Sequence, residues 1–113
     1  MKFQKGDSYY VDDNTKITDL VEAHDDNFDS VITEVDGYHP KGKGRKKIYN
    51  ENSQKGYFIL KGEGTIHVGL EAFDVKKEDF ILVPENKGHA LEGDFRALIV
   101  TSPPFNPADE EIK

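Results

Sequence analysis

Short apolar segments separated by turn residues recur about every ten residues along this chain. Several of them alternate apolar with polar residues, as half-buried strands do, and helical periodicity is scarce. Glycine, proline, asparagine and aspartate fill the gaps and favour turns. This spacing predicts an all-β protein, either a sandwich or a closed barrel. The clearest segments lie at residues 31–35, 57–60, 65–68, 72–75, 80–83 and 95–101.

The segment GYFILKGEGTIHV (56–68) carries two glycines one residue apart. Glycine adopts backbone conformations that other residues avoid, so Gly62 and Gly64 permit a sharp change of direction. We expect a tight reversal here, with residues 65–68 returning antiparallel to residues 57–60. A strand rather than a helix follows, so the pair is not a phosphate-binding loop.

The first thirty residues have a weaker pattern. Ile17, Leu20 and Val21 stand at helical spacing and follow two residues that are common at helix N-termini. They predict a short helix, and the acidic residues after it predict a solvated loop over residues 22–29.

Charge and composition narrow the classes of function. The 113 residues suit one domain, and 22 Asp and Glu against 15 Lys and Arg give a net charge of −7. This charge disfavours binding to nucleic acid or to an anionic membrane surface. The absence of cysteine excludes disulfides and thiol nucleophiles. The N-terminus lacks a signal-peptide core and no apolar stretch reaches membrane-spanning length, so we expect a cytoplasmic protein.

The region between Tyr57 and Leu91 resembles the cupin superfamily, whose members are small double-stranded β-helix barrels. Their first motif, Y-x-L-x-G-x-G, is similar to YFILKGEG here, and their second, G-D-x-x-x-x-P-x-G-x-x-H, is similar to EDFILVPENKGH. The matching residues are Gly62, Gly64, Asp79, Pro84 and His89, whereas Glu78 and Asn86 replace two of the family's glycines. The resemblance implies a cupin, or jelly-roll, barrel with a short N-terminal extension.

The same resemblance divides the chain and suggests a partner. It implies an N-terminal extension over residues 1–29, a cupin barrel over 30–105 and a charged tail over 106–113. Three prolines near the start of this tail disfavour a central strand and predict a segment lying over the body. Small cupins commonly pair through an edge strand, so the resemblance also implies a homodimer.

The metal motif of the family is degenerate here. Metal-binding cupins have an H-x-H pair and then a glutamate seven residues before the glycine of the first motif, and that position holds Lys55. The preceding pair falls near Tyr49 and Glu51, so His89 alone matches. A lysine ammonium repels a cation, which predicts that no metal is tightly bound. The alternative is a divalent metal held by His89, Glu51 and Tyr49.

A gap-free alignment at Gly62 turns Lys55, Tyr57 and Ile59 toward the barrel interior. We therefore predict that a small polar or anionic ligand, of the sugar or carboxylate class, binds in the barrel without a tightly bound metal. The same groups are suited to proton transfer, because burial would lower the pKa of the lysine. The predicted binding residues are His89, Lys55, Tyr57, Tyr49 and Glu51.

Two other functions stay open from the sequence. One is a metal-dependent dioxygenase or isomerase with unusual ligands, and the other is a non-catalytic dimeric protein with a sensory or structural role. Of the remaining histidines, His67 is expected to be exposed, while His24 and His39 are expected in loops and receive no role. The basic stretch at 41–47 is interpreted as a solvated loop.

Overall fold

The structure is a computed structural model that describes residues 4–24, 27–41 and 44–113. Its described residues form strands and one short 3₁₀ turn, which confirms the predicted all-β class. No helix in this part of the chain is long and apolar enough to cross a membrane. The elements are β1 (Gln4–Asp12), β2 (Thr15–His24), β3 (Asp29–His39), β4 (Ile48–Asn50), β5 (Gln54–Val68), β6 (Glu71–Lys76), β7 (Phe80–Val83), β8 (His89–Ser102), η1 (Pro107–Asp109) and β9 (Glu110–Ile112).

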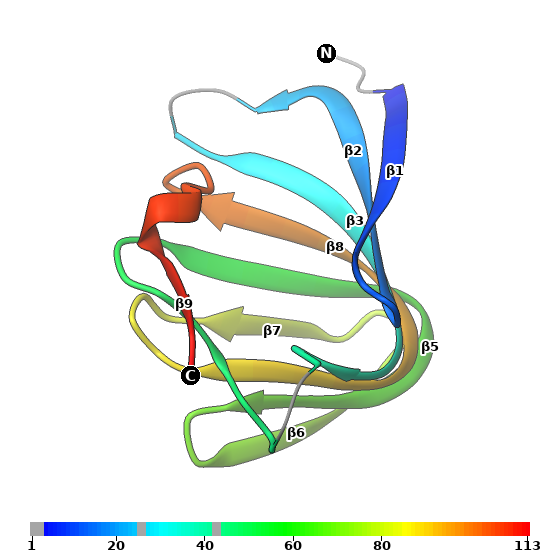
Figure 1. Cartoon of the computed structure of the whole chain (residues 1–113). Helices are drawn as coiled ribbons and strands as arrows, with labels where there is room; N and C mark the ends of the chain where they lie inside the picture. Colours follow the sequence, from blue (N-terminus) through cyan, green and yellow to red (C-terminus); the bar gives the residue numbers. More distant parts are fainter. Residues whose placement is uncertain (1–3, 25–26, 42–43) are drawn as a thin grey trace.

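The strands form one antiparallel sheet that curls on itself. Its order runs β1-β2-β3-β8, and from β8 the pairing continues to β5 on one side and to β4 and β9 on the other. Strands β6 and β7 both pair with β5, at opposite ends of that strand. Figure 1 shows the strands bending together round one side of the molecule. This curled sheet is the predicted cupin barrel.

The inner face of the sheet holds the core. Alternation along β3, β5 and β8 turns every second side chain inward, with one change of phase in β5 at the register shift between Ile59 and Lys61. The strand register aligns these side chains in rows. Ile59 and Ala97, which face each other across β5 and β8, are both fully buried. The two central rows are Tyr57, Ile99 and Val31, then Ile59, Ala97 and Thr33.

The outer face of the same strands is also apolar in part. Ile32, Leu98, Phe58 and Phe80 form a continuous cross-strand row from β3 to β7, and Phe80 is 58% exposed. Such a row is available to a second chain. The homodimer itself stays a prediction, as do the domain boundaries.

The two glycines of β5 do not make a reversal, so that prediction was wrong. Strand β5 is continuous from Gln54 to Val68, and the chain reverses only at the turn before β6. Gly62 and Gly64 instead let the backbone of β8 come close, because a Cβ atom at either position would lie 2.2 Å from a carbonyl oxygen of that strand. Gly93 of β8, with φ +126°, faces Gly64 at this close approach. The glycines therefore lie at the bend of β5, where its backbone and that of the paired strand β8 come very close.

The N-terminal and C-terminal predictions also need correction. Ile17 and Leu20 lie in strand β2 and not in a helix, because pairing with β1 and β3 outweighs a weak helical pattern. The expected acidic loop over 22–29 is shorter, since β2 reaches His24 and β3 begins at Asp29, and residues 25–26 lie outside the described part. The tail that was expected to lie over the body forms β9, which pairs with β4.

The two positions where the family has glycine keep a glycine-like backbone here. Glu78 has φ +76° and Asn86 has φ +52°, the only two non-glycine residues with positive φ in the described part of the chain. A side chain at such φ is strained, more for glutamate than for asparagine. At both positions the backbone therefore has a conformation that suits glycine better than the residue present.

We predict that Gly62→Ala lowers the free energy of unfolding by roughly 2–4 kcal/mol, because a Cβ would meet the Asp94 carbonyl oxygen at φ +83°. Gly44→Ala is the matched control, since Gly44 has φ +74° but nothing within 4 Å of an added Cβ. It should cost only about 1 kcal/mol. Equal losses in urea unfolding would contradict the close approach of β5 and β8.

We also predict that Glu78→Gly stabilises the protein by about 0.5–1 kcal/mol, because it removes backbone strain at positive φ. Glu85→Gly is the comparison, at a nearby exposed site outside the set of positive-φ residues. It should be neutral or destabilising. Thermal and urea unfolding of both variants would decide, and a loss of stability in Glu78→Gly would contradict the strained turn.

Candidate functional site

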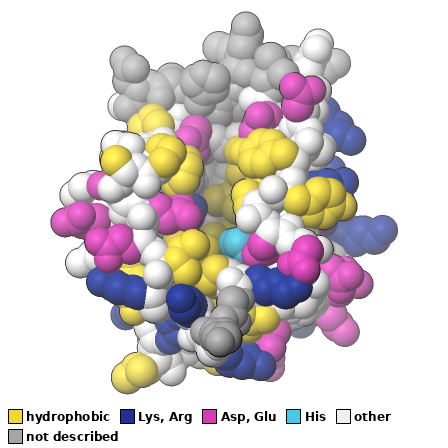
Figure 2. Space-filling model, in the orientation of Figure 1, with side chains coloured by type: hydrophobic (Ala, Val, Ile, Leu, Met, Phe, Trp, Pro, Cys, Tyr) yellow, Lys and Arg dark blue, Asp and Glu magenta, His cyan; other side chains and the backbone are white. Residues whose placement is uncertain are grey.

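A cavity of about 410 Å³ lies on the inner side of the curled sheet. Figure 2 shows one face of the molecule hollowed at its centre, with hydrophobic side chains beside the hollow, a histidine within it and charged side chains around it. The apolar lining includes Val31, Ile48, Leu91, Ile99 and Phe105. Strands from both halves of the chain and the C-terminal segment enclose this space, so it exists only in the folded barrel.

Lys55 lines this cavity, as the gap-free alignment predicted. It stands at the start of β5, in register with Thr101 of β8, which in turn faces Asp29 of β3. Burial lowers the pKa of the Lys55 ammonium, against the opposing charges of Glu110 and Asp29. Its Nζ makes no salt bridge or hydrogen bond to a described residue, and it lies 5.2 Å from the centre of the Phe105 ring.

Tyr57 and His89 form a buried pair across the barrel interior. The Tyr57 hydroxyl lies 2.9 Å from His89 Nε2, and both residues are almost fully buried. Burial lowers the pKa of His89 to about 3, with the charge of Lys55 adding to the effect. Burial also raises the pKa of Tyr57. Tyr57 lines the cavity and His89 does not, so the histidine is a neutral partner that holds the tyrosine in place.

Asp12 and His39 are a pair at the cavity that the sequence analysis missed. His39 Nδ1 lies 2.6 Å from Asp12 Oδ2, and both side chains line the cavity and are mostly buried. Burial by itself would raise the pKa of Asp12, but hydrogen bonds from His39, Asn14 N–H and Lys41 N–H together hold it below its usual value. The carboxylate therefore stays charged and fixes the imidazole ring through Nδ1, which leaves Nε2 for a ligand.

A sequence motif could not predict this pair, because its two residues lie 27 positions apart in the chain. The sequence analysis ended this strand at residue 35, before the turn-forming pair Asp36 and Gly37, and placed His39 in a loop, and that was wrong. Strand β3 continues through both residues to His39, with Gly37 facing Gly93 of β8. Pairing of β1, β2 and β3 then brings the end of β1, and with it Asp12, beside the end of β3.

Acidic groups outnumber basic ones around the cavity. Two ammonium groups, those of Lys41 and Lys55, face four carboxylates among its described lining residues. Thr33 also lines the cavity, and its hydroxyl oxygen is buried without a hydrogen-bond partner among the described residues. The cavity is thus polar and anionic at several points within an apolar shell. The carboxylates belong to Asp12, Asp19, Asp29 and Glu110.

The structure does not bring Tyr49 and Glu51 to the cavity. In β4, Ile48 and Asn50 are the buried residues, so Tyr49 points to the other face, where its ring packs against Gly88. Glu51 is exposed in the following turn. The alternative metal set of His89, Glu51 and Tyr49 therefore does not converge, and the described residues contain no group of three His, Cys, Asp or Glu suited to a metal ion.

His67 lies apart from this cavity. It is half-buried rather than fully exposed, and its Nε2 lies 3.2 Å from a Glu92 carboxylate oxygen. His24 was expected in a loop, but it ends strand β2, where it pairs with Asp29 of β3. The basic stretch at 41–47 contributes Lys41, which pairs with Asp13, and Arg45, which pairs with Glu92.

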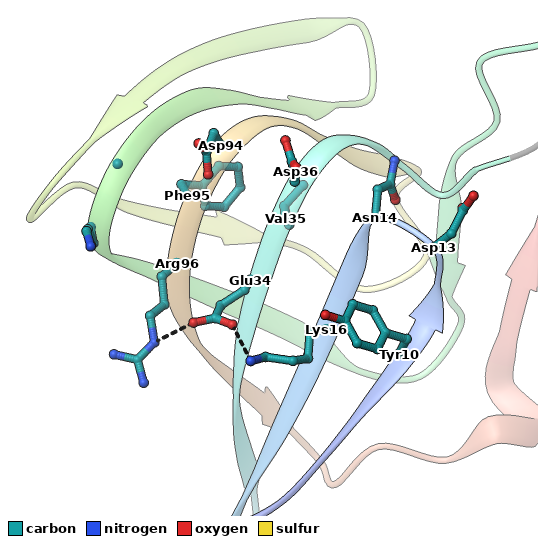
Figure 3. Close-up of a pocket in the computed structure, with 12 residues that line it drawn as sticks. Tyr10, Asp13, Asn14, Lys16, Glu34, Val35, Asp36, Asp94, Phe95 and Arg96 are labelled. Atoms are coloured by element: carbon teal, nitrogen blue, oxygen red, sulfur yellow. Dashed lines mark ion pairs between the residues drawn. The ribbon is translucent and has the colours of Figure 1, made fainter.

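A second hollow, of about 650 Å³, lies beside the bend of β5. Figure 3 shows Glu34 reaching toward Lys16 and Arg96, at 2.9 Å and 3.3 Å. These charges already satisfy one another, and none of the predicted binding residues lines this hollow. The barrel cavity is therefore the better candidate site.

Comparison with known proteins identifies the family. The model of the cupin domain family matches residues 36–101, which is more than half of the chain. The chain belongs to the cupin family. The match covers the strands from the end of β3 to β8, including Lys55, Tyr57 and His89.

The relatives of this cupin agree on the fold. A Streptomyces PAC13 variant solved with uridine superposes with a TM-score of 0.85 at 20% identity, covering 99% of this chain and 89% of that one. A RmlC-like cupin from Shewanella frigidimarina gives a TM-score of 0.67 at 15% identity, covering 90% and 85%. The uncharacterized protein MJ1618 of Methanocaldococcus jannaschii is 34% identical over 64 residues, and that match spans about half of each chain.

The buried histidine predicts a pH dependence of stability. Below pH 6.5 the unfolded chain protonates His89, whereas the folded chain keeps it neutral down to about pH 3. Stability should therefore fall as pH drops through this window, by at most about 1.4 kcal/mol per pH unit from this residue. His89→Gln should show a shallower fall between pH 7 and 4 in urea unfolding. His67→Gln is the control and should follow the native protein, and three equal slopes would contradict the prediction.

Proposed function

We propose that this cupin binds a small, neutral, sugar-like carbonyl compound in the barrel cavity and moves a proton on it with His39. The Asp12–His39 pair at the cavity is the observation that carries the proposal. A carboxylate that holds an imidazole through Nδ1 fixes its orientation and leaves Nε2 to take or give a proton. Proteins use this arrangement as a general base.

The charge around the cavity supports a neutral ligand over an anionic one. Four carboxylates against two ammonium groups disfavour a bound carboxylate or phosphate, even though Lys55 alone would attract it. The sugar class thus fits better than the carboxylate class, although the sequence left both open. A volume of about 410 Å³ suits a ligand of that size.

The polar lining supports a hydroxylated compound. The carboxylates accept hydrogen bonds from hydroxyl groups, the Thr33 hydroxyl needs a partner, and Lys55 donates to a carbonyl oxygen. Apolar side chains such as Ile99 and Leu91 can cover the carbon face of such a ligand. Together these groups favour the binding of a ligand that is apolar on one side and hydroxylated on the other.

The comparisons support the same class of ligand. Pac13, with a TM-score of 0.85 at 21% identity, is described as a nucleoside dehydratase, and its variants were solved with uridine, a hydroxylated ring compound. An ectoine synthase from P. lautus also shares the fold, with a TM-score of 0.67 at 16% identity. At this identity the likeness concerns the fold, and the proposal rests on the residues of this chain.

The proposed step is a proton transfer at carbon. His39 Nε2 takes the proton from the carbon next to the carbonyl group, and the electron pair moves onto the carbonyl oxygen. The Lys55 ammonium lines the same cavity and stabilises the negative charge that develops on that oxygen. Asp12 stabilises the imidazolium that forms. Returning the proton to another position gives an isomer, and loss of a neighbouring hydroxyl as water gives a dehydrated product.

We predict that the protein speeds exchange of the C2 proton of D-glyceraldehyde with solvent deuterium, followed by proton NMR in D₂O. His39→Gln should lower the exchange rate by about 10²–10⁴-fold while the probe still binds, because it removes the base and keeps a polar side chain. Asp12→Asn should also slow the exchange, since the imidazole loses its charged partner. His67→Gln is the control and should exchange at the native rate.

Two results would overturn the proposal. An unchanged rate in His39→Gln would exclude His39 as the base. Failure of D-glyceraldehyde, D-ribose and uridine to raise the melting temperature, with no exchange, would remove the proposed ligand class and favour a non-catalytic protein. D-glucuronate serves as the anionic comparison, and a larger shift with it than with the neutral probes would contradict the charge argument.

A further inference from the structure

In the proposed proton transfer, Lys55 acts only through its positive charge, and its capacity to react as an amine is not used. Its Nζ faces the cavity, and neither a salt bridge nor a hydrogen bond to a described residue holds it. Lys55 is half-buried, and an ammonium group that loses part of its hydration without gaining a hydrogen-bond partner costs stability. By contrast, Lys16, which is also half-buried, and the exposed Lys41 have carboxylate partners. The cost at Lys55 suggests that the amine itself is used.

The surroundings of Lys55 favour the neutral amine. The Phe105 ring lies 5.2 Å from Nζ, and Tyr57 stands two residues along on the same inward face of β5. Burial lowers the pKa of the ammonium, although Glu110 and Asp29 act in the opposite direction. These two carboxylates line the same cavity, but neither lies within salt-bridge distance of Nζ. A larger fraction of Lys55 is therefore free amine at neutral pH than for a surface lysine, and a free amine is the nucleophile that reacts with carbonyl groups.

The cavity is also better suited to a carbonyl group than to an anion. The four carboxylates of the lining oppose a bound anion, so Lys55 is poorly placed as a simple anion anchor. An aldehyde or ketone carries no charge, and its carbon accepts an amine. Asp29 and Glu110, on two different strands near Lys55, can exchange the protons that such a condensation requires.

We infer that Lys55 forms an imine with the aldehyde or ketone group of the ligand, an inference that rests on the proposed function and makes its chemistry covalent. The Nζ lone pair attacks the carbonyl carbon, and a C–N bond forms. The carbonyl oxygen gains two protons and leaves as water, so one amine and one carbonyl compound give one imine and one water without oxidation or reduction.

The imine would strengthen the proton transfer. The protonated imine carries a full positive charge on the nitrogen that is bound to the former carbonyl carbon. A free carbonyl group, by contrast, has only a hydrogen bond from the Lys55 ammonium. The electron pair of the C–H bond on the neighbouring carbon then forms a C=C bond, and the π electrons of the C=N bond move onto the nitrogen and neutralise its charge. His39, fixed by Asp12 at the same cavity, takes the proton. Hydrolysis of the imine afterwards releases the product and restores the amine.

The test is reductive trapping of the full-length protein with D-glyceraldehyde and sodium cyanoborohydride, which converts an imine into a stable secondary amine. Intact mass spectrometry measures the number of adducts, and peptide mapping measures the labelling rate at each lysine. We expect Lys55 to be labelled at least tenfold faster than Lys77, an exposed lysine in the turn before β7. Since both residues are in the same molecule, this comparison does not depend on the folding of any variant.

Variants and a second readout complete the design. Lys55→Arg keeps the positive charge and should lose the fast adduct, whereas Lys77→Arg, the matched control, should keep it. Glycerol, which lacks a carbonyl group, should give no adduct. Binding of D-glyceraldehyde is measured in parallel without reductant, by ligand-observed NMR on the native protein and on His39→Gln.

The outcomes separate the two proposals. If the probe binds and its C2 proton exchanges through His39, but Lys55 is labelled no faster than Lys77, then the imine is wrong and the proposed function stands. If the probe neither binds nor labels Lys55, both proposals fail. Fast labelling at Lys55 that Lys55→Arg abolishes supports the imine, and fast labelling that persists in Lys55→Arg at another lysine overturns it.

Discussion

The long antiparallel pairing of β5 with β8 is the constraint on which the rest of this molecule depends. The two strands stay in register from Gln54 and Ser102 to Val68 and His89, with one shift near the bend. At the bend, Gly62, Gly64 and Gly93 let the two backbones lie closer than side chains would permit. Because both strands curve together, their inward residues face one another across a space and not across a flat sheet.

That curvature explains how Tyr57 and His89 meet. They lie on different strands and 32 positions apart, yet the bend turns both toward the interior, where the hydroxyl and imidazole hydrogen-bond. The bond satisfies one polar atom on each residue in a place where water is excluded. The neutral histidine that results is a structural support for Tyr57. His89 is also the one residue that matched the metal motif in the sequence analysis, and here its Nε2 lies beside the Tyr57 hydroxyl.

The barrel interior contains polar side chains that lower the stability of the fold but are suited to chemistry. Lys55, Asp12 and His39 are all half-buried at the cavity, and only the last two hold each other. A well-packed apolar core at these positions would be more stable. The cavity thus combines one imidazole that a carboxylate holds in place and one lysine side chain without an ion-pair partner among the described residues.

Individual residues show which side-chain positions could be predicted from the sequence. The inward direction of Lys55 and Tyr57 was predicted from a gap-free alignment at Gly62, and alternation along a strand turns both residues to the same face. Tyr49 and Glu51 were placed by distance along the chain from a motif, and the structure turns them away from the cavity because β4 buries Ile48 and Asn50 instead. His39 had no local signal at all. Its strand was expected to end at Asp36-Gly37, a pair that usually makes a turn but here continues because Gly37 pairs with Gly93.

The sequence by itself determined the all-β class and most of the strands, since these depend on alternation and turn residues within short segments. The resemblance of residues 57–91 to cupins added the fold and the inward face of β5. Only the tertiary structure decided that Asp12 meets His39, that β5 runs unbroken through its glycines and that the C-terminal tail becomes a strand. The physical reason is the same in each case. Those features depend on which distant strands pair and in what register, and the free energy of that pairing comes from the whole sheet and not from the local pattern.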